Sequence, residues 1–286
     1  MSQRDTRIGF ITCVEVGFTC MREIYEVGGK LDVVFTMPDE RGTKISGRVF
    51  VDDFCKEQNC ELVFMHDINA AENVKIIKSY NLDWLFILWS QIAKPPVLSA
   101  LNLGALCIHP TLLPKGRGRA AIPTAILKGL RETGVTLFKI DEGIDTGPIL
   151  AQERIPMAED ETATTLYGKV AQAHQTLIAR IWNDLVAGQL VPVPQDDAQA
   201  TVWRGRKPED GRLRHEMTIA EVERMVRAVT KPYPGAFVRL NDGSTVRVWA
   251  GTPVGQQHSS SKGYRLQFSD GAYLATSFDM EAHEPG

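Results

Sequence analysis

Two side chains in the middle of the sequence, His109 and Asp145, have the types that acid–base chemistry needs. A histidine titrates near neutral pH, so it can move a proton to or from an attacking or leaving group. A carboxylate beside it can orient the ring and stabilise its charge. Such a pair suits acyl or one-carbon transfer, in which an amine attacks a carbonyl group and an oxyanion must be stabilised. Both residue types are also common in structural or solvated positions, which is the alternative interpretation.

The segments around these two residues indicate how they are positioned. Residues 104–108 are an apolar run that predicts a buried strand, after which prolines place His109 in a loop rather than a helix. A second predicted strand, residues 134–140, ends in the polar turn 141–147 that contains Asp145. Open α/β sheets bind their ligands where strands end and loops begin. We therefore expect the two side chains to meet in one cleft at the strand ends.

Strands and helices alternate over the first two thirds of the chain, which predicts an α/β fold with a Rossmann-like, mostly parallel sheet covered on both faces. The GxGxxG fingerprint is absent after the first strand, so NAD binding is disfavoured. The remaining strands are expected at 7–13, 31–36, 61–65, 84–88 and 148–154, and helices at 51–58, 70–79, 162–187 and in the stretch before Gly28.

Proline content and periodicity divide the chain into three parts. Residues 1–187 are the predicted catalytic domain, and residues 188–204, which carry prolines and little periodicity, are the predicted linker. Residues 205–286 are expected to form a small β-rich C-terminal domain, because short strands there are separated by Asn-Asp-Gly and Ser-Asp-Gly turns. These strands are expected at 236–240, 245–250 and 264–268.

The composition is that of an ordinary globular protein, with 43% hydrophobic and 23% charged residues. The net charge of −3 predicts no general attraction to nucleic acid or to an anionic membrane. The five cysteines are odd in number and form no CxxC pair, which favours a reduced, cytoplasmic protein without a metal site. No signal peptide and no membrane-spanning segment is expected, because no apolar run approaches ~18 residues.

Three motifs around the two residues resemble those of the folate-dependent formyltransferases, which use 10-formyltetrahydrofolate. The motifs follow one another in the family's order at compatible distances, and the likeness continues into the C-terminal part. They are His-Pro-Thr-Leu-Leu-Pro at 109–114, Glu-Thr-Gly-Val-Thr at 132–136 and Gly-Ile-Asp-Thr-Gly at 143–147, with the C-terminal likeness at 206–211 and 226–237.

The resemblance implies a Rossmann-like domain that binds the folate at the strand ends, with no metal and no covalent cofactor. His109 matches the family's catalytic histidine, and Asp145 matches its catalytic aspartate. Two loops match those that clasp the pteridine ring, whose amide-like edge needs backbone donors and acceptors. These loops contain Gln91, Ile92 and Ala93 in one case and Asp141, Glu142, Gly143 and Ile144 in the other.

One position in the predicted catalytic set departs from the family. Transferases of the family carry Asn-x-His, in which the asparagine amide helps to polarise the formyl oxygen, whereas this chain has Cys107 before His109. A thiol is a weak donor, and loss of one oxyanion donor costs about 10²–10³ in rate in other enzymes. A 10-formyltetrahydrofolate hydrolase and a folate-binding protein without catalysis are therefore alternatives. A formyl thioester on Cys107 is a further hypothesis, set against an inert buried cysteine.

The formyl acceptor expected first is a primary amine of a small molecule, a nucleotide-linked amino sugar. The basic loop that ends in Arg119 resembles enzymes that formylate such sugars, where arginine meets phosphate or carboxylate, and a hydroxamate-siderophore amine is a second candidate. Initiator tRNA is disfavoured because the loop 37–47 is short and of mixed charge, so methionyl-tRNA formyltransferase is kept as an alternative. By analogy alone, the β-rich domain is expected to support a homodimer.

Overall fold

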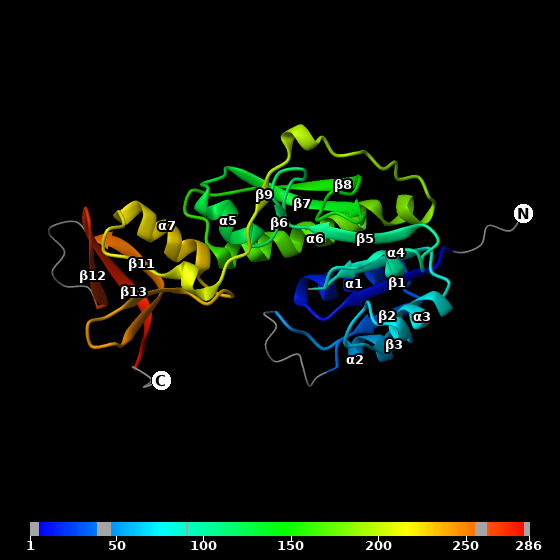
Figure 1. The fold of residues 1–286 in the computed structure, drawn as a ribbon, viewed down its shortest axis with the longest axis horizontal. Helices are drawn as coiled ribbons and strands as arrows, with labels where there is room; N and C mark the ends of the chain where they lie inside the picture. The colour runs from blue at the N-terminus through cyan, green and yellow to red at the C-terminus, as the bar shows by residue number, and fades with distance from the viewer. Residues whose placement is uncertain (1–5, 39–46, 90, 255–261, 283–286) are drawn as a thin grey trace, which may run out of the picture. The chain divides into compact units, whose positions relative to one another are not determined.

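The computed structural model of the chain describes residues 6–38, 47–89, 91–254 and 262–282, which form two compact units (Figure 1). The predicted loop 37–47 lies largely outside the described residues. Two segments from within the predicted domain 1–187 group with the C-terminal part, and most of the predicted linker 188–204 groups with the first unit. The first unit is Met1–Gly118, Thr133–Ile155 and Val170–Val202, and the second is Arg119–Glu132, Pro156–Lys169 and Trp203–Gly286.

The first unit is built on one seven-stranded sheet. Its strands are β1 (Ile8–Thr12), β2 (Val33–Thr36), β3 (Glu61–Phe64), β4 (Trp84–Leu88), β5 (Gly104–His109), β7 (Glu132–Lys139) and β8 (Ile149–Pro156). They lie in the order β3-β2-β1-β4-β5-β7-β8. The five strands from β3 to β5 run parallel, and β7 runs antiparallel to β5. The prediction of a Rossmann-like, mostly parallel sheet is confirmed.

Helices α1 (Glu15–Glu26), α2 (Asp52–Glu57), α3 (Ala71–Ser79) and α4 (Pro95–Leu98) connect the parallel strands, and α6 (Ala163–Val186) follows β8. The chain moves outward from β1 to β3 through α1 and α2, then crosses back to β4 and β5 through α3 and α4. Right-handed crossovers in opposite directions place these two pairs of helices on opposite faces of the sheet. Helix α6 lies beside α1, because Glu23 of α1 and Thr176 of α6 line one surface hollow.

Alternate residues of each strand fill the two faces of the sheet. Phe10 and Phe86 stack on one face with ring centroids 5.4 Å apart. On the other face Ile11 belongs to a buried cluster that includes Ile77 of α3 and Val97 of α4. Strands that are apolar on both sides are what a parallel sheet between two helical layers requires.

The antiparallel pairing of β5 with β7 corrects the predicted route by which His109 and Asp145 meet. Leu106 pairs with Lys139 and His109 pairs with Thr136, so the end of β7 lies beside the start of β5. The two strands therefore end at opposite ends of the sheet. His109 is also the last residue of its strand rather than a loop residue. The segment between β7 and β8 must instead return along the sheet to bring the carboxylate to the ring.

The second unit contains a four-stranded antiparallel sheet with α7 (Ile219–Val229) in contact with it (Figure 1). The predicted β-rich C-terminal domain is thus confirmed, with one long strand, β13, that the sequence analysis did not identify. Helix α5 (Ala121–Leu127), which comes from the middle of the chain, also packs on α7. In spatial order the strands are β10 (Ala236–Arg239), β11 (Thr245–Val254), β13 (Gly271–Glu281) and β12 (Tyr264–Phe268).

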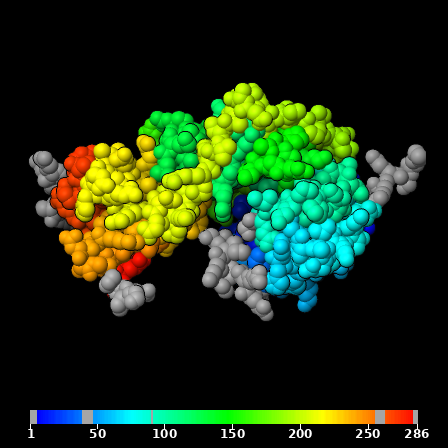
Figure 2. All heavy atoms as spheres, viewed as in Figure 1, coloured from blue at the N-terminus to red at the C-terminus, as the bar shows by residue number. Residues whose placement is uncertain are grey.

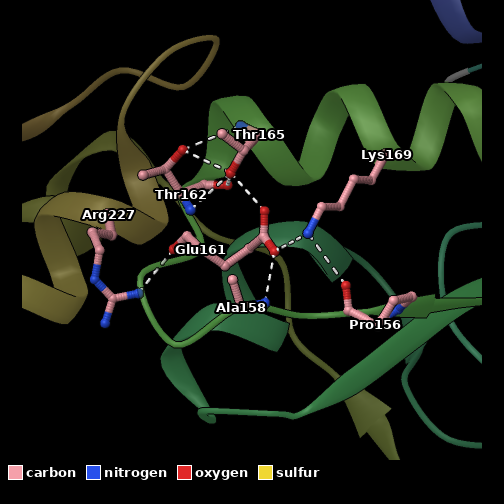
Figure 3. Close-up of polar contacts among 7 residues, drawn as sticks. All are labelled: Pro156, Ala158, Glu161, Thr162, Thr165, Lys169 and Arg227. Atoms are coloured by element: carbon pink, nitrogen blue, oxygen red, sulfur yellow. Dashed lines mark hydrogen bonds and ion pairs between the residues drawn. The ribbon is translucent and has the colours of Figure 1, made fainter.

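A buried carboxylate, Glu161, holds the second unit's segment 156–169 in place (Figure 3). Glu161 is 3% exposed, and its carboxylate accepts hydrogen bonds from Lys169 Nζ at 2.5 Å and Thr165 Oγ1 at 2.6 Å. Its backbone oxygen accepts from Arg227 Nη1 of α7 at 2.8 Å. Burial raises the pKa of this carboxyl, but the hydrogen bonds from Lys169 and Thr165 outweigh burial and hold the pKa below its usual range. The network joins the start of α6 to α7.

Candidate active site

The imidazole ring of His109 is 8% exposed and lies at the end of β5. Its Nε2 atom is 2.8 Å from the backbone oxygen of Gly116, and its Nδ1 atom is 3.5 Å from Oδ2 of Asp145. Both partners are hydrogen-bond acceptors. A neutral ring has one N–H and can serve only one of them, whereas the protonated ring can serve both. Because the Nε2 contact is the shorter one, the single N–H of the neutral ring is better placed on Nε2. Nδ1 is then the ring nitrogen that can accept a proton.

Asp145 adopts a left-handed backbone conformation, with a φ of 54°. Aspartate tolerates this region better than most residues. Its Oδ2 atom accepts a hydrogen bond of 2.8 Å from the backbone N–H of Gly118. A backbone donor and the ring of His109 therefore converge on one carboxylate oxygen. The structure brings the predicted histidine and aspartate together, as expected, although by a different route.

The turn between β7 and β8 is organised from inside by Asp141. Its Oδ1 atom accepts hydrogen bonds from Thr146 Oγ1 at 2.7 Å and from the backbone N–H of Gly143 at 3.1 Å. Gly147 closes the turn, because a Cβ atom there would lie 1.8 Å from the backbone oxygen of Lys139. The carboxylate of Asp141, predicted to contact the folate, is thus engaged within the turn itself.

The predicted folate loop after β4 lies at the edge where β5 ends, because β4 and β5 are parallel neighbours. Gln91 has a fixed orientation in this loop: its Oε1 accepts from the backbone N–H of Ile68 at 2.9 Å, and its Nε2 donates to the backbone oxygen of His66 at 2.8 Å. Ala93 is buried in the core cluster, and Ile92 is 69% exposed. The loop is therefore rigid at Gln91 and presents an apolar side chain at Ile92.

The other predicted folate loop is the turn after β7, in which Glu142, Gly143 and Ile144 are exposed. Ile144 is 60% exposed. Each of the two loops thus presents one apolar side chain, Ile92 or Ile144, and several backbone groups. This combination fits a flat ring whose edge carries donors and acceptors.

Cys107 lies two residues before His109 on β5 and is half-buried. Burial, with a further contribution from the negative charge of Asp145, raises the pKa of its thiol to about 12. The sulfur therefore stays protonated at neutral pH, and a thiol is a poor nucleophile compared with a thiolate. This finding disfavours the thioester hypothesis and leaves Cys107 as a weak S–H donor.

Arg119, predicted to bind the acceptor, belongs to the second unit, whereas the histidine and the aspartate belong to the first. It is exposed, and its backbone N–H donates to the oxygen of Trp203 at 3.1 Å. Its guanidinium therefore has access to solvent, and its role in binding stays a prediction.

Two residues near the pair were missed by the sequence analysis. Gln195, in the predicted linker, donates hydrogen bonds to the backbone oxygens of Asp145 and Gly147. His174 of α6 is buried, its Nδ1 is 2.7 Å from the oxygen of Val170, and burial lowers its pKa to about 4. A histidine inside the apolar stripe of a long helix was a usable signal, whereas nothing in the sequence alone marked Gln195.

Within the described residues, no group of three or more His, Cys, Asp and Glu side chains is arranged to hold a metal ion. In the same ranges, every helix is too short or too polar to cross a bilayer.

Comparison with protein families matches both halves of the chain. Residues 40–181 match the formyl transferase family, and residues 206–279 match the formyl transferase C-terminal domain. A methionyl-tRNA formyltransferase of Lachnospira eligens is 28% identical over 246 residues, which are 85% of this chain and 78% of that protein. The chain belongs to the formyltransferase family, so the predicted family and enzyme class are confirmed.

Two solved structures show the same fold. HypX from Aquifex aeolicus in complex with tetrahydrofolic acid aligns with a TM-score of 0.68 and 20% identity over 96% of this chain. This chain spans only 44% of HypX. The N-formyltransferase from Helicobacter canadensis, in complex with folinic acid and dTDP-3-aminofucose, aligns with a TM-score of 0.65 and 17% identity over 97% of this chain and 99% of that one. Both of these neighbours bind reduced folates.

Proposed function

We propose that the protein transfers the formyl group of 10-formyltetrahydrofolate to the primary amine of a small molecule. The observation that carries this proposal is the buried imidazole of His109 with the carboxylate of Asp145 3.5 Å from its Nδ1 atom. Family membership supports the reaction class, and the reduced folates bound by the two structural neighbours support the formyl donor. The loops with Gln91 and Ile144 would hold the pteridine.

The folate supplies the formyl group, and the protein supplies proton transfer and orientation. His109 accepts the proton that the attacking amine loses as the new C–N bond forms, and Asp145 compensates the charge on the ring. His109 then delivers this proton to the nitrogen from which the formyl group departs. In this proposal the thiol of Cys107 donates to the formyl oxygen. Because a thiol is a weak donor, it would stabilise the negative charge that develops on this oxygen poorly.

The proposed acceptor is a nucleotide-linked amino sugar. The Helicobacter enzyme, which was solved with dTDP-3-aminofucose, supports a small amine, and the exposed Arg119 offers a cation for a phosphate. The Lachnospira relative acts on methionyl-tRNA, so that acceptor is the second candidate. We also propose a catalytic domain at 1–187, a connecting segment at 188–204, a C-terminal domain at 205–286 and a cytoplasmic homodimer, in line with the family matches and the five unpaired cysteines.

Release of tetrahydrofolate from 10-formyltetrahydrofolate tests the proposal. The release is followed by absorbance in separate reactions of the purified protein with nucleotide amino sugars, hydroxamate-precursor amines and charged initiator tRNA. Release that requires an amino sugar and disappears in His109→Ala is the expected result. Release without any amine would identify a hydrolase instead. Folate binding without release under every condition would identify a binding protein and overturn the proposal.

A further inference from the structure

Gln195 connects the predicted linker to the turn that carries Asp145. The segment after α6 runs along the surface of the first unit, past β8 (Figures 1 and 2). From there Nε2 of Gln195 donates to the backbone oxygens of Asp145 at 2.9 Å and Gly147 at 2.7 Å. Both N–H bonds of one carboxamide thus hold one turn, on either side of its Thr146 position.

The other end of the same carboxamide is held by a buried cation. Oε1 of Gln195 accepts from Nε of Arg117 at 3.0 Å and from Nη2 at 2.9 Å. Arg117 is 6% exposed, and its Nη2 also contacts Oδ1 of Asp197 at 2.7 Å. A guanidinium only donates, and the two turn oxygens only accept. The carboxamide therefore has one orientation that satisfies all four bonds, and a flipped amide would lose every one of them.

Arg117 lies between the two backbone groups that contact the catalytic pair. The oxygen of Gly116 faces Nε2 of His109 at 2.8 Å, and the N–H of Gly118 donates to Oδ2 of Asp145 at 2.8 Å. Gln195 therefore contacts both segments that set the distance between His109 and Asp145.

Thr201 forms a second attachment between the segment after α6 and the loop that contains Gly116 and Arg117. The backbone N–H of Gly116 donates to Thr201 Oγ1 at 2.9 Å, and the N–H of Arg117 donates to the oxygen of Thr201 at 2.9 Å. The loop that faces His109 is thus fixed by Thr201, while the turn of Asp145 is fixed by Gln195.

We propose that Gln195 is a positioning residue for formyl transfer, which holds the turn of Asp145 at the ring of His109 by bonding Arg117 on one side and the turn oxygens on the other. The inference rests on the proposed function of this pair. Hydrogen-bond partners that orient the ligands of a metal contribute about 10- to 100-fold to activity, and we expect an effect of the same order for a partner that orients Asp145. A small misplacement of a reacting group is enough to produce such a loss.

The Gln195→Glu variant separates the two ends of the carboxamide. Its carboxylate keeps the size and still accepts from Arg117, but it has no N–H for the turn and repels the two backbone oxygens. We expect kcat to fall about 10- to 100-fold with the KM for the folate changed less than about threefold. The matched control is Gln189→Glu, on the same segment, because Gln189 is exposed and lies well before the part of the segment that bonds Arg117. This control should keep its activity within about twofold.

A double-variant cycle distinguishes positioning from a general structural role. In an Asp145→Asn background, Gln195→Glu should cause little further loss of kcat, because the group that it positions is already inactive. The melting temperature of each variant is measured alongside. Equal losses in both backgrounds, or a loss of activity that only follows loss of folded protein, would overturn the inference. Full activity in Asp145→Asn would instead refute the proposed function, so the two failures are distinguishable.

Discussion

His109 and Asp145 meet at 3.5 Å between Nδ1 and Oδ2 although the strands that precede them run antiparallel. The end of β7 lies beside the start of β5, so strand geometry alone separates the two residues. The contact depends on the turn between β7 and β8, which is stabilised from inside by Asp141 and from outside by Gln195. Catalysis at this pair should therefore be sensitive to residues of the turn and of the segment after α6 as well as to the pair itself.

Replacing His109 should abolish most of the formyl transfer without unfolding the protein. His109→Gln keeps a side-chain N–H near the position of Nε2, as a donor for the oxygen of Gly116, but cannot accept and return a proton near neutral pH. A positioned general acid–base group contributes about 10²–10⁴ in rate, and kcat should fall by that amount. Steady-state rates with the accepted amine, together with a circular dichroism melt, check the result. A variant that retains more than a tenth of the wild-type kcat would show that the ring is structural.

Cys107 should limit the rate of the wild-type protein. In Cys107→Asn the side-chain amide supplies a better donor to the formyl oxygen, and a gain of about 10-fold or more in kcat is expected. Cys107→Ala should keep most of its activity, because the raised pKa of the thiol prevents it from acting as a nucleophile. Loss of all transfer in Cys107→Ala, with a formyl adduct on the wild-type protein by mass spectrometry, would restore the thioester hypothesis.

The sequence predicted the class of the fold because its strands carry clear signals. β4 (Trp84–Leu88) is a pure apolar run and was placed at its observed bounds. Helix α5 (Ala121–Leu127) was missed, since its seven residues include a proline and offer no full amphipathic repeat. The direction of β7 was not predicted, because an apolar run has no signal for parallel or antiparallel pairing.

The sequence predicted the residues of the candidate catalytic pair, but it did not predict the hydrogen bonds that hold the pair in position. His109 and Asp145 were identified by type, motif and the turns that follow strands. The bonds of Gln195 join groups that are 48 and 50 residues away in the sequence, and no local pattern encodes such contacts. The prolines near Gln195 and the lack of periodicity predicted a linker. A segment that is held by side-chain hydrogen bonds has the same appearance in the sequence as a free one, so the two could not be distinguished.

Cys60 should be the thiol that alkylating reagents modify first. A hydrogen bond from Cys55, assisted by Tyr25, holds the pKa of Cys60 below that of an ordinary thiol despite partial burial. In contrast, burial raises the pKa of Cys20 well above its usual range. At pH 7.5 iodoacetamide should therefore label Cys60 ahead of the other four cysteines, as read by peptide mass spectrometry. Cys55→Ala removes the main hydrogen bond, and should slow labelling of Cys60 about threefold or more. Unchanged labelling in that variant would contradict the assigned cause.

Glu161 should make the stability of the second unit depend on pH. Its pKa is lowered in the folded chain, so the folded state binds this proton more weakly than the unfolded state. The stabilisation is complete above the unfolded-state pKa of about 4.3 and is lost as pH falls through the folded-state pKa. Glu161→Gln should lower the free energy of unfolding by about 1–3 kcal/mol at pH 7, because Lys169 and Thr165 lose their charged acceptor.

The control for this prediction is Glu159→Gln. Glu159 pairs with Arg131, and these side chains are 80% and 77% exposed. An exposed pair contributes little, so this variant should change the free energy of unfolding by less than about 0.5 kcal/mol. Urea unfolding of both variants at pH 7 and at acid pH supplies the comparison. The difference between Glu161→Gln and wild type should shrink as the pH falls through the folded-state pKa of Glu161, since the wild-type carboxyl is then protonated as well. A difference that stays constant across this range would show that packing, and not the charge of Glu161, carries its effect.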